Sequence, residues 1–75
     1  MKAKAIIRIM NDLDTCDIGE GLVMVEAAGR SYTYNPRKRE SGNEWTVNED
    51  EDVLMLSNDT GTHWISCDAV TSIEI

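Results

Sequence analysis

His63 and Cys67 are residue types that often take part in catalysis or metal binding, and they lie four positions apart. An imidazole and a thiolate could share a zinc ion, or a histidine base could activate a cysteine nucleophile. A zinc site needs three or four ligands, and only Cys16 or Asp68 could join this pair. No neighbouring residue supplies an oxyanion donor or an orienting group. We therefore expect neither a metal site nor a thiol catalyst here.

The triplet Asp59-Thr60-Gly61 resembles the catalytic triplet of aspartic proteases, in which two such carboxylates share a proton. In that family the triplet usually follows an apolar run directly, whereas Ser57 and Asn58 intervene here. These residue types favour a tight hairpin turn instead. The sequence also contains no glycine-rich phosphate loop and no nucleophile elbow. We expect a protein that is not an enzyme and that uses no cofactor.

A basic segment with nearby aromatic residues is one possible binding site. Residues 30–39 contain four bases and no acid. Arginine beside aromatic rings suits the capture of a phosphate and the stacking of a base. The candidate ligand-binding residues are Tyr32, Tyr34, Arg37, Lys38, Arg39 and Trp45. The alternative is an exposed loop whose bases pair with the protein's own acids.

An acidic segment is the second possible site. Residues 40–75 contain nine acids and no base, and the chain as a whole carries a formal net charge of −7. Carboxylates spaced on a rigid sheet can imitate phosphates and attract a basic surface. The candidate partner-binding residues are Glu44, Glu49, Asp50, Glu51, Asp52 and Asp59. The alternative is that the acids only keep a small protein soluble, and that the acidic turn acts as a gatekeeper against aggregation of the adjacent apolar strand.

Short apolar runs separated by turn residues predict β-strands along the whole chain. The expected strands cover residues 3–10, 22–26, 30–35, 44–48, 53–57, 62–66 and 71–75, with a single helical turn at 67–70. The order strand, tight turn, strand, helical turn and final strand over residues 53–75 resembles the closing order of SH3-like barrels. We therefore expect one all-β domain over residues 1–75, a small antiparallel SH3-like barrel of five to seven strands. The alternative is an α+β domain with a short helix at 13–20 or 67–70.

These expectations lead to two functional hypotheses. Small size, high acidity and the lack of catalytic residues are typical of phage-encoded inhibitors. The first hypothesis is a non-enzymatic binding or inhibitor protein of this phage-accessory type, whose acidic face docks on a basic surface of a host or defence macromolecule. The second is a homo-oligomer that sequesters a nucleotide-like anion through the basic and aromatic loop. Both assume a cytoplasmic protein that binds neither nucleic acid directly nor a membrane, and the sequence leaves open whether Trp45 and Trp64 are core or interface residues.

Overall fold

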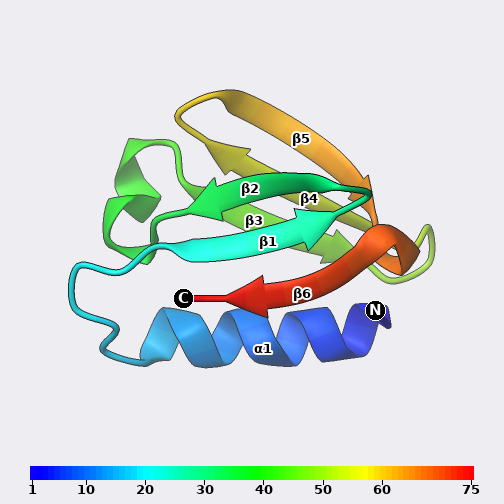
Figure 1. Ribbon diagram of the computed structural model, residues 1–75, viewed down its shortest axis with the longest axis horizontal. Helices are drawn as coiled ribbons and strands as arrows, with labels where there is room; N and C mark the ends of the chain where they lie inside the picture. The colour runs from blue at the N-terminus through cyan, green and yellow to red at the C-terminus, as the bar shows by residue number, and fades with distance from the viewer.

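One α-helix and six β-strands make up the fold. The computed structural model describes residues 1–75 (Figure 1). The elements are α1 (Ala3–Thr15), β1 (Val23–Ala27), β2 (Arg30–Tyr34), the 3₁₀ segment η1 (Pro36–Ser41), β3 (Glu44–Asn48), β4 (Val53–Asn58), β5 (Gly61–Ser66), the 3₁₀ turn η2 (Cys67–Ala69) and β6 (Val70–Glu74). All six strands lie within one residue of the ranges that the sequence predicts. The predicted helical turn before the last strand is confirmed by η2.

The strands form two three-stranded antiparallel sheets, in the orders β2-β1-β6 and β3-β4-β5. The mostly β, antiparallel character that the sequence predicts is confirmed. The predicted barrel is not closed, because no strand ladder joins the two sheets into one. On one side the gap between β2 and β4 is bridged by a side chain, since Asn58 Nδ2 donates to the carbonyl of Thr33 at 2.8 Å.

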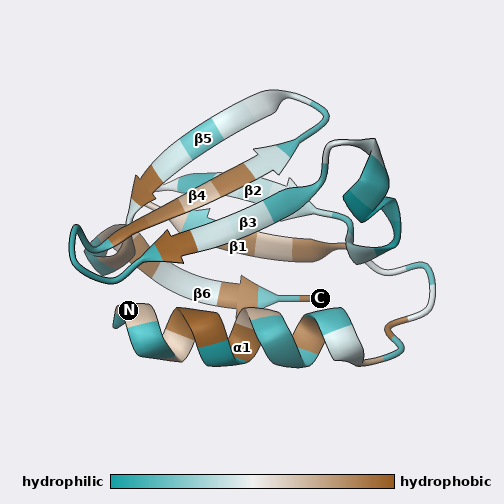
Figure 2. Ribbon diagram, turned by 180° about the vertical axis from the view of Figure 1, so that it is seen from behind, coloured by the Kyte–Doolittle hydropathy of each residue, from teal (hydrophilic) through white to brown (hydrophobic).

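The helix α1 corrects the prediction of a strand over residues 3–10. The apolar residues Ile6, Met10 and Leu13 are four and three positions apart, so they share one face of a helix. Ile6 and Met10 are completely buried, whereas Lys4 and Arg8 are exposed. Both ribbon views show α1 along the side of the fold where β6 runs (Figures 1 and 2), and α1 also contacts β3. The helix therefore supplies the layer that covers the open side of the sheets.

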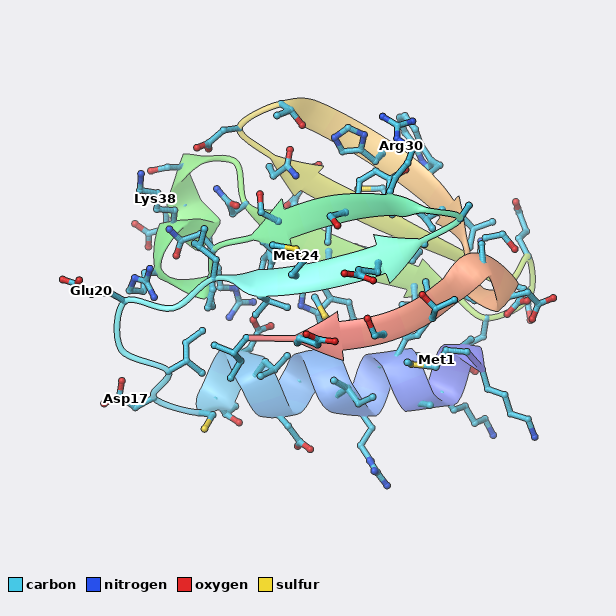
Figure 3. All side chains as sticks on the ribbon, in the orientation of Figure 1. Met1, Asp17, Glu20, Met24, Arg30 and Lys38 are labelled. Atoms are coloured by element: carbon cyan, nitrogen blue, oxygen red, sulfur yellow. The ribbon has the colours of Figure 1, made fainter.

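The core lies between the two sheets and α1. Its members are Ile6, Met10, Val23, Val25, Ala27, Tyr34, Leu54, Leu56, Ile65, Cys67 and Val70. The start of the chain is fixed to the end of the core, because the Met1 ammonium donates to the carbonyls of Cys67 and Val70, each at 2.9 Å. Figure 3 shows Met1 beside the segment that leads into β6. The last strand and the helix therefore hold each other in place.

Candidate binding face

The sheet β3-β4-β5 has one face that the core does not use. Side chains alternate between the two faces of a strand, so the burial of Leu54, Leu56 and Ile65 directs their neighbours outward. Across the three strands, the outward side chains form the rows Glu44–Ser57–Thr62, Thr46–Met55–Trp64 and Asn48–Val53–Ser66. We call these nine residues the outer face. Figure 2 shows this sheet in front, with hydrophilic turns at both of its ends.

Trp64 lies in the middle row of the outer face. Its side chain is 72% exposed, and its cross-strand neighbour is the half-buried Met55. The other tryptophan has a different position, because Trp45 is half-buried and its Nε1 donates to the carboxylate of Asp14 at 2.9 Å. The sequence leaves open which tryptophans belong to the core. In the structure Trp45 packs against the core, and Trp64 faces outward. Strand alternation alone shows that only one of Trp64 and Ile65 can face the core, but not which of them does.

Acidic residues occupy both ends of the outer face. Glu49, Asp50 and Glu51 are exposed in the turn between β3 and β4. Exposed Asp59 lies in the turn between β4 and β5, at the end where Glu44 begins β3. The structure contains one ion pair, in which Arg39 Nη1 lies 4.0 Å from Asp14 Oδ2, so none of these five carboxylates is paired with a base. The structure thus places the predicted partner-binding acids around one face of one sheet.

Asp52, the sixth of the predicted partner-binding acids, has an internal role. Its backbone has a positive φ of 58°, and its carbonyl accepts a hydrogen bond from the Cys67 amide at 2.9 Å. Burial, and after it the nearby Asp52 carboxylate, raises the pKa of the Cys67 thiol above its ordinary value. Asp52 therefore helps to fix η2 against the β3–β4 turn, and any test of the acidic face should leave it unchanged.

Tyr34 and Trp45, from the basic and aromatic candidate set, are bound to an acid inside the fold. Tyr34 is fully buried and its hydroxyl donates to Asp14 Oδ1 at 2.6 Å, while Trp45 donates to Asp14 Oδ2. Burial and the Asp14 carboxylate raise the pKa of Tyr34 well above its ordinary value. Asp14, whose side chain is 8% exposed, thereby links α1 to β2 and β3. No sequence signal identified Asp14, because its partners lie 20 and 31 positions away.

The bases of the same candidate set do not converge on a site either. Arg37 donates to the carbonyls of Gly19, Glu20 and Gly21, so its guanidinium closes the loop that precedes β1. Lys38 is exposed, and Figure 3 shows it at the opposite end of β2 from Arg30.

Tyr32 of β2 lies beside His63 of β5, so its ring contact joins the two sheets. Its ring centroid is 5.1 Å from that of His63, and the Arg30 guanidinium lies 5.5 Å from the centre of the Tyr32 ring. The structure thus distributes the six candidate residues among three separate internal contacts and one exposed lysine.

The possible catalytic residues lie in the β4–β5 turn, in β5 and in η2. Asp59 and Thr60 make the predicted tight turn between β4 and β5, Gly61 begins β5, and the Thr60 amide donates to Asn58 Oδ1 at 2.9 Å. His63 Nε2 lies 2.8 Å from Thr60 Oγ1, within hydrogen-bonding distance. No three His, Cys, Asp or Glu side chains come together in a way that could hold a metal ion, and the surface has no pocket. Cys16 is an exposed free thiol, and Cys67 is a buried one.

Neither a known protein family, nor a curated protein, nor a solved structure matches this chain. The one α-helix, α1, falls short of the length and apolar character that crossing a membrane requires.

Proposed function

We propose that this chain is a small acidic binding protein without catalytic activity, whose outer face docks on a basic surface of another macromolecule. The observation that carries the proposal is the set of exposed carboxylates at both ends of this face, none of which is paired with a base. No base occurs anywhere in residues 40–75, so nothing on these three strands screens the negative potential. A field of one sign speeds the encounter with a basic partner and repels nucleic acid and anionic membranes.

The distance between the two acidic ends of the outer face indicates which kind of basic surface it could fit. The acidic turn and the Glu44–Asp59 end are separated by the length of strand β3, which has five residues. At roughly 3.4 Å per residue, this separation is about 17 Å. Such a span suits a groove that normally holds the phosphates of a nucleic acid. The proposal therefore includes the inhibitor role of the phage-accessory type, with a host or defence protein as the target and the cytoplasm as the place of action.

The order of the last elements in the chain supports an SH3-like fold. The order β4, tight turn, β5, η2 and β6 is the order in which SH3-like barrels close. The two sheets leave the barrel open, and α1 covers the open side. We infer that the chain is an SH3-like variant in which a helix takes the place of strand-to-strand closure.

The alternative, a homo-oligomer that sequesters a nucleotide-like anion, draws less support from the structure. Arg37, Arg39, Tyr34 and Trp45 all make contacts within the fold. A ligand would have to displace these contacts before it could use the side chains. We therefore rank this alternative below the acidic docking protein.

The proposal is tested by removing charge from the face without touching Asp52. The variant E49Q/D50N/E51Q loses three negative charges next to the outer face. The matched control D12N/E20Q/E26Q loses three charges from exposed acids elsewhere. Proteins that bind the immobilised wild-type chain in a lysate of its source cells are identified and purified, and their affinities for all three forms are then measured.

We expect a basic partner that binds wild type and control alike but binds the face variant at least about tenfold more weakly, a loss of about 1.4 kcal/mol. We also expect the affinity of the wild type to fall steeply as salt is added, because salt screens exposed charges. Equal binding to all three forms would refute the proposal. Equal weakening of both variants would also refute it, because net charge rather than this face would then explain the binding.

A further inference from the structure

Trp64 lies on the edge strand β5, at the level of the outer face that is midway between its two acidic ends. It lies in the middle row, beside Met55, and the next row along contains the half-buried Val53. Each row is two residues from the next, which corresponds to roughly 7 Å along the strands. The face thus has an apolar middle, with carboxylates beyond it at both ends.

The exposure of Trp64 is not explained by the packing of the fold. Its ring faces away from the core, and its indole N–H makes no hydrogen bond within the chain, in contrast to that of Trp45. Tryptophan is the residue type that most often carries binding energy at the centre of a protein interface, where surrounding polar residues exclude water. The arrangement on the outer face matches that pattern, with an apolar centre and a charged rim.

We propose that Trp64 is the anchor of the docking face, and that its occupant is a basic protein segment with aliphatic side chains between two groups of lysine or arginine. The inference rests on the proposed function, and it adds the chemistry of the partner. The acids at the two ends attract the bases, which mainly sets the rate of association. The burial of Trp64 and Met55 against aliphatic groups sets the lifetime of the complex.

Charge complementarity favours this occupant over two others. A nucleic acid could stack a base on Trp64, but the carboxylates at both ends would repel its phosphates. A second copy of the chain could cover Trp64, but pairing face to face would bring two sets of unpaired acids together. A basic segment is the occupant that satisfies both the apolar centre and the acidic ends.

The experiment uses two synthetic peptides of equal charge as probes. Each has three lysines at either end and four residues between them, so the inner lysines are about 17 Å apart when the peptide is extended, which matches the separation of the acidic ends. In one peptide the central residues are all glycine, and in the other two of them are leucine. Nitrogen–proton correlation spectra resolve the indole N–H signals of Trp64 and Trp45, so the second tryptophan serves as an internal control.

We expect the leucine peptide to bind wild type at least about tenfold more tightly than the glycine peptide, equivalent to about 1.4 kcal/mol. The Trp64 indole signal should shift on binding, and the Trp45 signal should stay in place. W64A should bind both peptides equally. L22A should keep the preference for leucine, because it removes an apolar side chain that is 42% exposed outside the face.

The results separate failure of the anchor from failure of the docking face. If W64A keeps the preference for leucine, or if wild type shows none, the inference about Trp64 is overturned while the acidic docking face stands. If D12N/E20Q/E26Q weakens peptide binding as much as E49Q/D50N/E51Q does, or if wild type binds neither peptide, the docking face itself is refuted. A dimer of the free wild type that W64A dissolves would show that a second copy is the occupant, and would also overturn the inference.

Discussion

Replacing Asp14 by alanine should destabilise the protein more than any other change of a single polar side chain. The Asp14 carboxylate accepts hydrogen bonds from Tyr34 at 2.6 Å and from Trp45 at 2.9 Å, and Arg39 lies 4.0 Å away. These contacts join the last turn of α1 to the ends of two strands in different sheets. No other side chain connects the helix to both sheets through hydrogen bonds.

The size of the loss follows from the burial of each partner. A hydrogen bond to a charged group contributes about 1.5–3 kcal/mol, and a buried donor that loses its acceptor carries a further desolvation cost. Tyr34 is fully buried, so in D14A its hydroxyl has no access to water, whereas half-buried Trp45 can recover some hydration. We expect D14A to lose about 3–4 kcal/mol of the roughly 4–11 kcal/mol that a domain of this size has. D14N should lose about 1–2 kcal/mol, because an amide can accept from Trp45 and donate to the Tyr34 oxygen.

Urea denaturation followed by tryptophan fluorescence measures these free energies of unfolding. D12A is the matched control, because Asp12 is an exposed acid on the same helix whose side chain makes no hydrogen bond. It should stay within about 0.5 kcal/mol of wild type. If D14A unfolds within the same margin, or if D14N is as unstable as D14A, the carboxylate does not hold the helix to the sheets and the reasoning is refuted.

Three further predictions follow from the burial and backbone geometry. Because the pKa of Tyr34 is raised above its ordinary value of 10.0, the folded protein keeps a phenol proton that the unfolded chain loses. The contribution of Tyr34 to the free energy of unfolding is therefore intact below about pH 10, and above that pH it declines by up to about 1.4 kcal/mol per pH unit. Urea midpoints between about pH 9 and about pH 11 should fall more steeply for wild type than for Y34F. Ala28, next to Gly29, has a positive φ of 51°, a conformation that asparagine adopts more readily than alanine. A28N should therefore raise the free energy of unfolding by about 0.5–1 kcal/mol. An unchanged or lower melting temperature would contradict this. Iodoacetamide should label exposed Cys16 quickly and buried Cys67 only after unfolding, and mass spectrometry that finds both labelled together in the folded protein would contradict the burial.

The strands could be predicted from the sequence because their signals are local. Residues 44–48 and 53–58 alternate apolar and polar side chains or form short apolar runs, and turn residues separate them. The helix could not be predicted in the same way, because Ile6, Ile7 and Ile9 favour a strand by their branched side chains. The burial of Ile6 and Met10 against the sheets outweighs that preference, and it depends on contacts with distant parts of the chain.

In the candidate site, too, some features could be predicted from the sequence and others depend on contacts between distant residues. The acids around the outer face were identified from composition alone, because nine acids without a base is an unusual run. The different role of Asp52, which fixes η2, could be recognised only from its contact with Cys67 in the structure. The exposure of Trp64 required the pairing register, since the sequence shows two adjacent large residues but not which of them faces the core.

In the proposed function, the two faces of β3-β4-β5 have different roles, one in stability and the other in binding. The inward side carries Trp45, whose bond to Asp14 ties the sheet to the helix. The outward side carries acids without a base partner, so neutralising Glu49, Asp50 and Glu51 removes mutual repulsion and breaks no ion pair. A variant at these positions should be at least as stable as wild type. Lost binding in that variant therefore cannot be attributed to unfolding, which makes the charge test of this face decisive.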